Sequence, residues 1–135
     1  KKKFGEDKIF EFRRSWDVPP EPLSKNNPYH PVNIETYNDI PREKLPDTES
    51  LKDTYERVIK YYLDNIKENL DKNILIAAHG NSIRALCKYL FKLDNENISK
   101  LEIPTGNPLL LTFHNFEVKE AKYLDSSRAK DLIKF

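Results

Sequence analysis

Apolar positions recur at helical spacing near the middle of the chain. Ser50 precedes this stretch and Asp53 follows three residues later, an arrangement typical of a capping box at a helix start. The apolar and aromatic positions that follow are Leu51, Tyr55, Val58, Ile59, Tyr62, Ile66 and Leu70. Their spacing predicts a half-buried helix that runs from the cap to about Leu70.

A different pattern follows this helix. Residues 74–78 read Ile-Leu-Ile-Ala-Ala, without a polar interruption. Such a run predicts a strand over residues 73–78 that is covered on both faces in an α/β sheet. His79, Gly80 and Asn81 then form a tight turn before a second helix, expected over residues 82–93. The turn is therefore predicted at the carboxyl end of a buried strand, where open α/β sheets bind ligands.

The remaining elements are shorter. We expect a helix over residues 5–15, a helical turn over 95–100, strands over 108–114 and 119–124 joined around Asn115 and Phe116, and a helical tail over 126–135. Residues 18–46 hold seven of the nine prolines, so this segment is predicted to be a long loop of the lid or binding type.

This order of elements indicates an α/β fold in one domain that spans residues 1–135. The sheet is expected to be incomplete, because a buried strand needs a neighbour on each side and the two later strands do not supply both. The sequence also contains no methionine and begins with three lysines. Both features suggest that an upstream part of the protein is absent.

Charge and cysteine content exclude several classes of function. The chain has 23 basic and 22 acidic residues, so no overall field favours nucleic acid or a membrane surface. The only cysteine, Cys87, has apolar neighbours and is expected to be a buried, inert thiol in a reducing, cytoplasmic compartment. No pair of His, Cys or Asp residues has a spacing typical of a metal site.

Two groups of residues could carry chemistry. The amides at the start of the second predicted helix, together with His79, Gly80 and Asn81, could hold a phosphate. The alternative is a histidine with a structural role between strand and helix. Arg13 and Arg14 could bind phosphate or carboxylate in bidentate fashion. The alternative for this pair is solvated charge at a helix end. Structural roles are favoured for His30 and His114.

Five motifs in this sequence resemble the cofactor-dependent phosphoglycerate mutases of the histidine phosphatase superfamily, in the family's order and at about its spacing. The motifs are Phe4-Gly5-Glu6-Asp7, the stretch Arg13-Arg14-Ser15-Trp16-Asp17-Val18-Pro19-Pro20, the stretch from Leu45 to Thr54, the stretch from Ile76 to Leu86, and Ile103-Pro104-Thr105-Gly106. The resemblance implies a three-layer α/β/α fold, represented here by its C-terminal half.

The resemblance also implies roles for individual residues. His79 would be the second active-site histidine, Gly80 and Asn81 would bind the phosphate, and Arg13 and Arg14 would bind the substrate's carboxylate or second phosphate. Arg84 and Glu49 match the family pattern as supporting framework. The family's Arg-His-Gly strand, which carries the phosphorylated histidine, and its Asn-Glu-Arg-His-Tyr-Gly segment do not occur in this sequence.

The implied activity is the interconversion of 3-phosphoglycerate and 2-phosphoglycerate in glycolysis and gluconeogenesis, primed by 2,3-bisphosphoglycerate. The implied partners are small phosphorylated three-carbon acids, and the parent enzyme could be a homodimer or homotetramer. We expect the chain alone to be inactive. The alternatives are a bisphosphoglycerate mutase or histidine phosphatase of the same fold, or a non-catalytic chain that binds polyanions.

Overall fold

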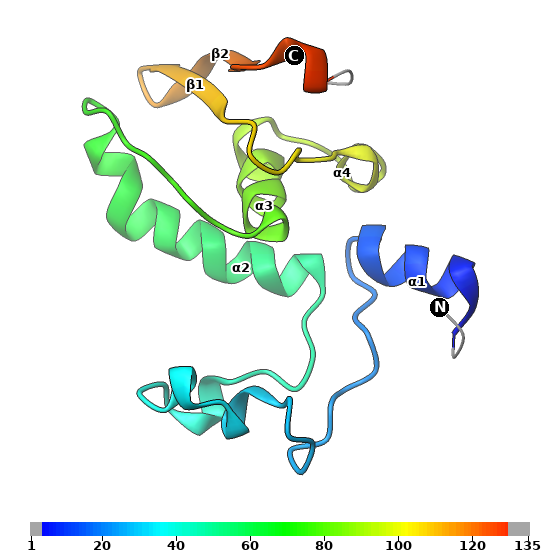
Figure 1. The fold of residues 1–135 in the computed structure, drawn as a ribbon. Helices are drawn as coiled ribbons and strands as arrows, with labels where there is room; N and C mark the ends of the chain where they lie inside the picture. Colours follow the sequence, from blue (N-terminus) through cyan, green and yellow to red (C-terminus); the bar gives the residue numbers. More distant parts are fainter. Residues whose placement is uncertain (1–3, 130–135) are drawn as a thin grey trace.

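Two helices form the centre of the molecule. The computed structural model describes residues 4–129, and in it α2 (Leu51–Tyr61) packs against α3 (Gly80–Leu90) (Figure 1). The side chains of Leu51, Ala85 and Cys87 are buried together with Ile98 and Leu101. Burial of this apolar surface stabilises the helix pair.

Local sequence signals account well for α2. The Ser50 Oγ accepts a hydrogen bond from the Asp53 amide at 3.2 Å, and the Asp53 carboxylate accepts one from the Ser50 amide at 2.8 Å. The predicted capping box is therefore confirmed. The helical backbone continues beyond Tyr61 as a π-helical turn, Tyr62–Ile66, and a 3-10 turn, Lys67–Asn69.

Residues 73–79 contradict the sequence-based expectation. They form no strand, and the side chains of Ile74, Leu75 and Ile76 are 42%, 92% and 42% exposed. A strand is held by backbone hydrogen bonds to its neighbours, and no strand pairs with this segment in the described part of the chain. Without a central strand, the predicted three-layer arrangement is also absent from residues 4–129, which form a mixed helical structure with a two-stranded sheet.

The two C-terminal strands are confirmed. β1 (Leu109–His114) pairs with β2 (Glu117–Tyr123) in antiparallel register, with Leu109 opposite Tyr123. Asn115 and Phe116 connect them, with φ angles of 49° and 65°. Positive φ at both central residues is the requirement of a two-residue type I′ turn.

The shorter helices also follow the sequence. α1 (Gly5–Arg14) and α4 (Asn95–Lys100) form close to the predicted positions, and the Asp94 carboxylate caps α4 by accepting from the Asn97 amide. The 3-10 turn Ser126–Arg128 begins the predicted helical tail, whose last residues, 130–135, lie outside the described residues.

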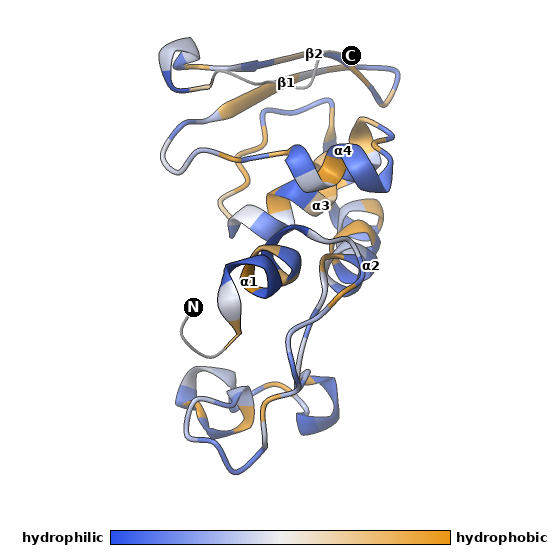
Figure 2. Cartoon of the chain, turned by 90° about the vertical axis from the view of Figure 1, so that its right-hand side faces the viewer, coloured by the Kyte–Doolittle hydropathy of each residue, from blue (hydrophilic) through white to orange (hydrophobic). Residues whose placement is uncertain are grey.

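The proline-rich segment is a loop, as predicted. Within residues 18–46 the only regular elements are three 3-10 turns, at Pro31–Asn33, Glu35–Tyr37 and Arg42–Lys44. The segment lies at one end of the molecule and the β-hairpin at the other, with the helices between them (Figure 2).

Candidate functional site

The start of α3 presents unpaired backbone donors next to His79. His79 is the N-cap residue, with extended backbone angles (φ −64°, ψ 149°), and its side chain does not cap the helix. A Cβ atom placed on Gly80 would meet no atom within 4 Å, so the space beside this turn is open. The first amides of a helix are unsatisfied and carry the positive end of the helix dipole. This turn can therefore receive an anion.

The His79 imidazole is exposed and is available to a ligand. Within residues 4–129 it makes no hydrogen bond or ion pair with another side chain. Asn81, also exposed, directs its Oδ1 atom to the guanidinium of Arg84, at 3.1 Å from Nη1. The amide group of Asn81 is thus held by a residue one turn further along the same helix.

Arg84 joins the start of α3 to α1 and α4. Its side chain is buried, with 4% exposure. Its Nη1 donates to the Arg13 carbonyl at 3.3 Å as well as to Asn81, and its Nη2 donates to the Ile98 carbonyl at 2.7 Å. One guanidinium therefore fixes the last turn of α1 next to the first turn of α3. The family resemblance implies a supporting role for Arg84, and its burial and main-chain contacts are compatible with that role.

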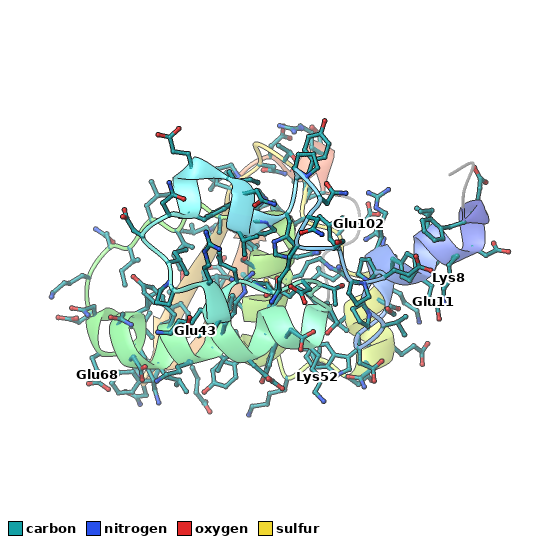
Figure 3. The ribbon with its side chains drawn as sticks, turned by 90° about the horizontal axis from the view of Figure 1, so that it is seen from below. Lys8, Glu11, Glu43, Lys52, Glu68 and Glu102 are labelled. Atoms are coloured by element: carbon teal, nitrogen blue, oxygen red, sulfur yellow. The ribbon has the colours of Figure 1, made fainter. Side chains whose placement is uncertain are left out.

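The two arginines of α1 have different environments. Arg13 is exposed, whereas Arg14 is half-buried and forms an ion pair with Glu102, just after α4. Figure 3 shows Glu102 near α1, where Lys8 and Glu11 form their own ion pair at 2.6 Å. Burial lowers the pKa of Arg84, the nearby Arg14 charge lowers it further, and Glu102 opposes this shift. Arg14, Arg84 and Glu102 thus form one electrostatic cluster.

A cavity of about 710 Å³ adjoins this cluster. Arg14, Lys100 and Arg128 contribute cationic side chains to its lining, and Glu102 contributes a carboxylate. The Arg128 guanidinium is held by the carbonyls of Thr105 and Gly106, at 2.6 and 3.3 Å. Three cationic side chains and one carboxylate therefore face this cavity, and Glu102 pairs with one of the cations, Arg14.

Among the predicted site residues, Asn81 at the start of α3 and the Arg13 main chain at the end of α1 are connected by the Arg84 guanidinium. The sequence predicts that His79 follows a buried strand, but residues 73–79 form no strand. Sequence reasoning did not identify Glu102 as the partner of Arg14. No local signal could have found it, because the two residues are 88 positions apart.

The remaining candidate residues are His30, His114 and Cys87. His30 is fully buried, and its Nδ1 accepts from the Val32 amide at 3.1 Å, so its Nε2 donates to Asp47 at 3.0 Å. His114 is exposed at the end of β1. Cys87 is buried as predicted, and burial raises the pKa of its thiol to about 12. An inert thiol follows from this pKa.

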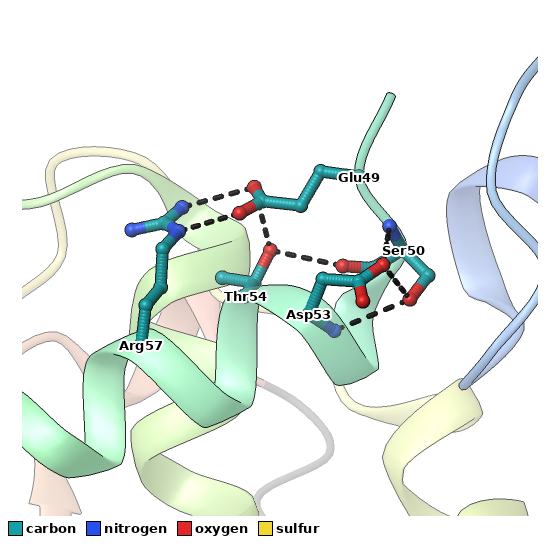
Figure 4. Close-up of polar contacts among 5 residues, drawn as sticks. All are labelled: Glu49, Ser50, Asp53, Thr54 and Arg57. Carbon is teal, nitrogen blue, oxygen red and sulfur yellow. Dashed lines mark hydrogen bonds and ion pairs between the residues drawn. The ribbon is translucent and has the colours of Figure 1, made fainter. Parts of the chain in front are cut away.

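A second polar network surrounds the start of α2. The Glu49 carboxylate accepts from the Arg57 Nε at 2.5 Å and from the Thr54 hydroxyl at 2.9 Å (Figure 4). The hydrogen bond from Arg57 is the main reason that the pKa of Glu49 is lowered. Glu49 therefore stabilises the entry to α2, as its framework assignment suggests.

Between residues 4 and 129, no group of three His, Cys, Asp or Glu side chains could hold a metal ion. In the same range, no helix is both long and apolar enough to cross a bilayer.

Comparison with known proteins decides the family. The family model of the histidine phosphatase superfamily, branch 1, matches residues 23–125. The chain belongs to this superfamily. Over its whole length it is 66% identical to the 2,3-bisphosphoglycerate-dependent phosphoglycerate mutase of Pelagibacter ubique (strain HTCC1062), of which it covers 58%.

Other histidine phosphatase relatives carry the same name. The chain is 45% identical to the 2,3-bisphosphoglycerate-dependent phosphoglycerate mutase of Maricaulis maris (strain MCS10), over 96% of this chain and 55% of the relative. It is 53% identical to that of Borreliella afzelii (strain PKo), over 80% of this chain and 44% of the relative. The resemblance to phosphoglycerate mutases is thereby confirmed, and the chain spans about half the length of these relatives.

Proposed function

We propose that this chain is the C-terminal part of a single-domain phosphoglycerate mutase that interconverts 3-phosphoglycerate and 2-phosphoglycerate. The observation that carries the proposal is the 66% identity to one such mutase along the entire chain. The arrangement around Arg84 supports it, because an anion-binding turn and a pair of arginines lie on either side of one buried guanidinium. The proposed setting is glycolysis and gluconeogenesis in the cytoplasm, as a homodimer or homotetramer.

His79, Gly80 and Asn81 act on the transferred phosphoryl group in this proposal. An N–H of the His79 imidazole donates a hydrogen bond to a phosphoryl oxygen, and the first amides of α3 donate to others. Charge that grows on these oxygens during transfer is stabilised by donors already in place. The openness around Gly80 supports this role, since a phosphate needs close approach to the backbone.

Arg13 and Arg14 hold the substrate's carboxylate or second phosphate. Arg14 then exchanges the Glu102 carboxylate for that of the substrate. The Glu102 side chain is 72% exposed, and exposed ion pairs contribute only about 0–1 kcal/mol. Replacement of Glu102 by a substrate anion therefore loses little free energy. Bidentate pairing of Arg14 with the substrate restores the contact.

The nucleophilic histidine of the proposed reaction lies outside this chain. The three histidines here follow Tyr29, Ala78 and Phe113, so none has the arginine of an Arg-His-Gly strand before it. The primer 2,3-bisphosphoglycerate, when bound, supplies the phosphoryl group that loads that nucleophile. Its two phosphates and one carboxylate suit the donors of this chain, which are cationic side chains and helix-start amides.

A hybrid enzyme tests the proposal. This chain replaces the matching 58% of the Pelagibacter mutase, and the hybrid is assayed with 3-phosphoglycerate and the bisphosphate primer. We expect turnover on the scale of ~10 per second from the hybrid, and none from this chain alone. Formation of 2-phosphoglycerate, bisphosphate and inorganic phosphate is measured in parallel, which separates a mutase from a bisphosphate synthase or a phosphatase. A folded hybrid that forms no 2-phosphoglycerate, beside an active parent enzyme, contradicts the proposal.

A further inference from the structure

Arg84 fixes the orientation of the Asn81 side-chain amide. A guanidinium carries only N–H donors, so the atom of Asn81 that it contacts must be the oxygen. The Arg84 Nη1 donates to Asn81 Oδ1 at 3.1 Å. The Nδ2 group of Asn81 is therefore on the far side of the amide, and within residues 4–129 it has no hydrogen-bond partner. Asn81 thus offers two free N–H donors next to the open turn at Gly80.

The guanidinium that holds this amide is itself held in place. Arg84 is 4% exposed, and its Nη2 donates to the Ile98 carbonyl at 2.7 Å. Its Nη1 donates to the Arg13 carbonyl at 3.3 Å as well as to Asn81. An exposed asparagine without such a partner can rotate by half a turn and present either its oxygen or its NH2 group to a ligand. The fixed guanidinium removes this choice, because only one orientation gives it an acceptor.

We propose that Arg84 is a positioning residue, which turns the Asn81 amide so that Nδ2 donates to an oxygen of the bound phosphoryl group. The inference rests on the proposed function, in which His79, Gly80 and Asn81 act on that group. In this orientation Asn81 adds donors to those of the helix start. In the reverse orientation its Oδ1 would face an anionic oxygen, and two acceptors without a proton between them repel each other. Arg84 therefore acts on the phosphoryl group through Asn81, without touching it.

A purely structural role for Arg84 makes a different prediction. Its hydrogen bonds to the carbonyls of Arg13 and Ile98 connect α3 to α1 and α4, and they are made whether or not Asn81 is present. Loss of Arg84 would then weaken phosphate binding equally with and without the Asn81 side chain. In the positioning role, most of the loss depends on Asn81. A double-mutant cycle separates the two roles, because contacts that do not involve Asn81 cancel in it.

Phosphate titration of this chain measures the cycle. The affinity for inorganic phosphate is obtained by NMR from the Gly80 backbone amide in the parent chain, Arg84→Gln, Asn81→Ala and the double variant. Arg84→Gln should weaken binding at least about tenfold, since hydrogen bonds to charged groups are the stronger class. In the Asn81→Ala background the same change should weaken binding only about threefold or less, through the lost charge alone. Arg57→Gln is the matched control and should leave the affinity unchanged, because Arg57 pairs with Glu49 at the start of α2.

The side-chain amide resonances of Asn81 give a second measurement, which does not require the Arg84 variant to fold. In the parent chain, phosphate should shift both Nδ2 protons of Asn81 together with the Gly80 amide. Any of three results would overturn the inference: Nδ2 protons that phosphate leaves unmoved, equal effects of Arg84→Gln in the two backgrounds, or an effect of Arg57→Gln as large as that of Arg84→Gln.

The hybrid enzyme separates this inference from the proposed function. In an active hybrid, Arg84→Gln should lower kcat by a much larger factor when Asn81 is present than when it is alanine, because Asn81 acts on the group in transfer. Equal factors in the two backgrounds would again overturn the positioning role. A folded hybrid without turnover contradicts the proposed function instead, and the phosphate titration of this chain still decides whether Arg84 orients Asn81.

Discussion

Arg84 is a buried cation at the meeting point of three helices. Its two Nη atoms donate to Arg13, Asn81 and Ile98, whereas its Nε–H has no hydrogen-bond partner within residues 4–129. Burial disfavours the charged form and lowers the pKa of Arg84. The hydrogen bonds to two main-chain carbonyls and one amide oxygen offset this cost, so the residue stabilises the site only while all three are made.

Removal of the Arg84 side chain should therefore destabilise the fold. We expect Arg84→Ala to lower the free energy of unfolding by about 2–3 kcal/mol, since hydrogen bonds to charged groups are the stronger class. Arg57→Ala is the control, because the Arg57 side chain is 57% exposed and its pair with Glu49 should contribute only about 1 kcal/mol. Urea unfolding followed by circular dichroism measures both. Equal losses in the two variants would show that Arg84 does not hold the helices together.

At the level of single elements, α2 depends on the polar groups at its start. The side chain of Ser50 is the main cause of the lowered pKa of Asp53, and the Ser50 amide adds to it. A carboxyl group whose pKa is lower in the folded state stabilises the fold above its ordinary pKa, which is 3.8. This stabilisation is lost as the pH falls through the folded value.

Ser50→Ala should remove this contribution. We expect a loss of about 1 kcal/mol at neutral pH, the usual cost of deleting an N-cap side chain, and a rise in the pKa of Asp53 toward 3.8. The difference in stability between variant and parent should shrink as the pH falls below that value. NMR titration of the Asp53 carboxyl and unfolding at several pH values measure these effects, with the exposed Ser126→Ala as control. An unchanged Asp53 titration would mean that the capping box does not set its pKa.

Elements defined by local signals were predictable from sequence, and elements that need distant partners were not. The α2 cap and the turn at Asn115 and Phe116 depend on neighbours in the chain, and both formed where expected. The segment 74–78 has the composition of a buried strand, but its structure depends on strands that must lie beside it. The Arg14–Glu102 pair was missed for the same reason, because a fold brings together residues that sequence spacing separates.

The whole molecule combines a packed helical centre with an open apolar cavity. The buried side chains form two clusters, one shared by α2, α3 and α4 and one made of Ile59, Tyr62 and Leu86. Residues 74–78 and β1 border an apolar cavity. In the proposed function, the nucleophilic histidine comes from the part of such a mutase that this chain does not cover, since the chain covers 58% of the Pelagibacter enzyme.

The most direct test of this account is the mutase activity of the hybrid enzyme with His79→Ala, beside His114→Ala as a control at an exposed histidine. If His79 stabilises the phosphoryl group in transfer, its loss should lower maximal turnover about a hundred- to a thousandfold, the usual effect of removing one preorganised donor. His114→Ala should leave turnover unchanged. Equal activity of the two variants, with both folded, would contradict the central claim that the turn at His79, Gly80 and Asn81 carries the chemistry of this chain.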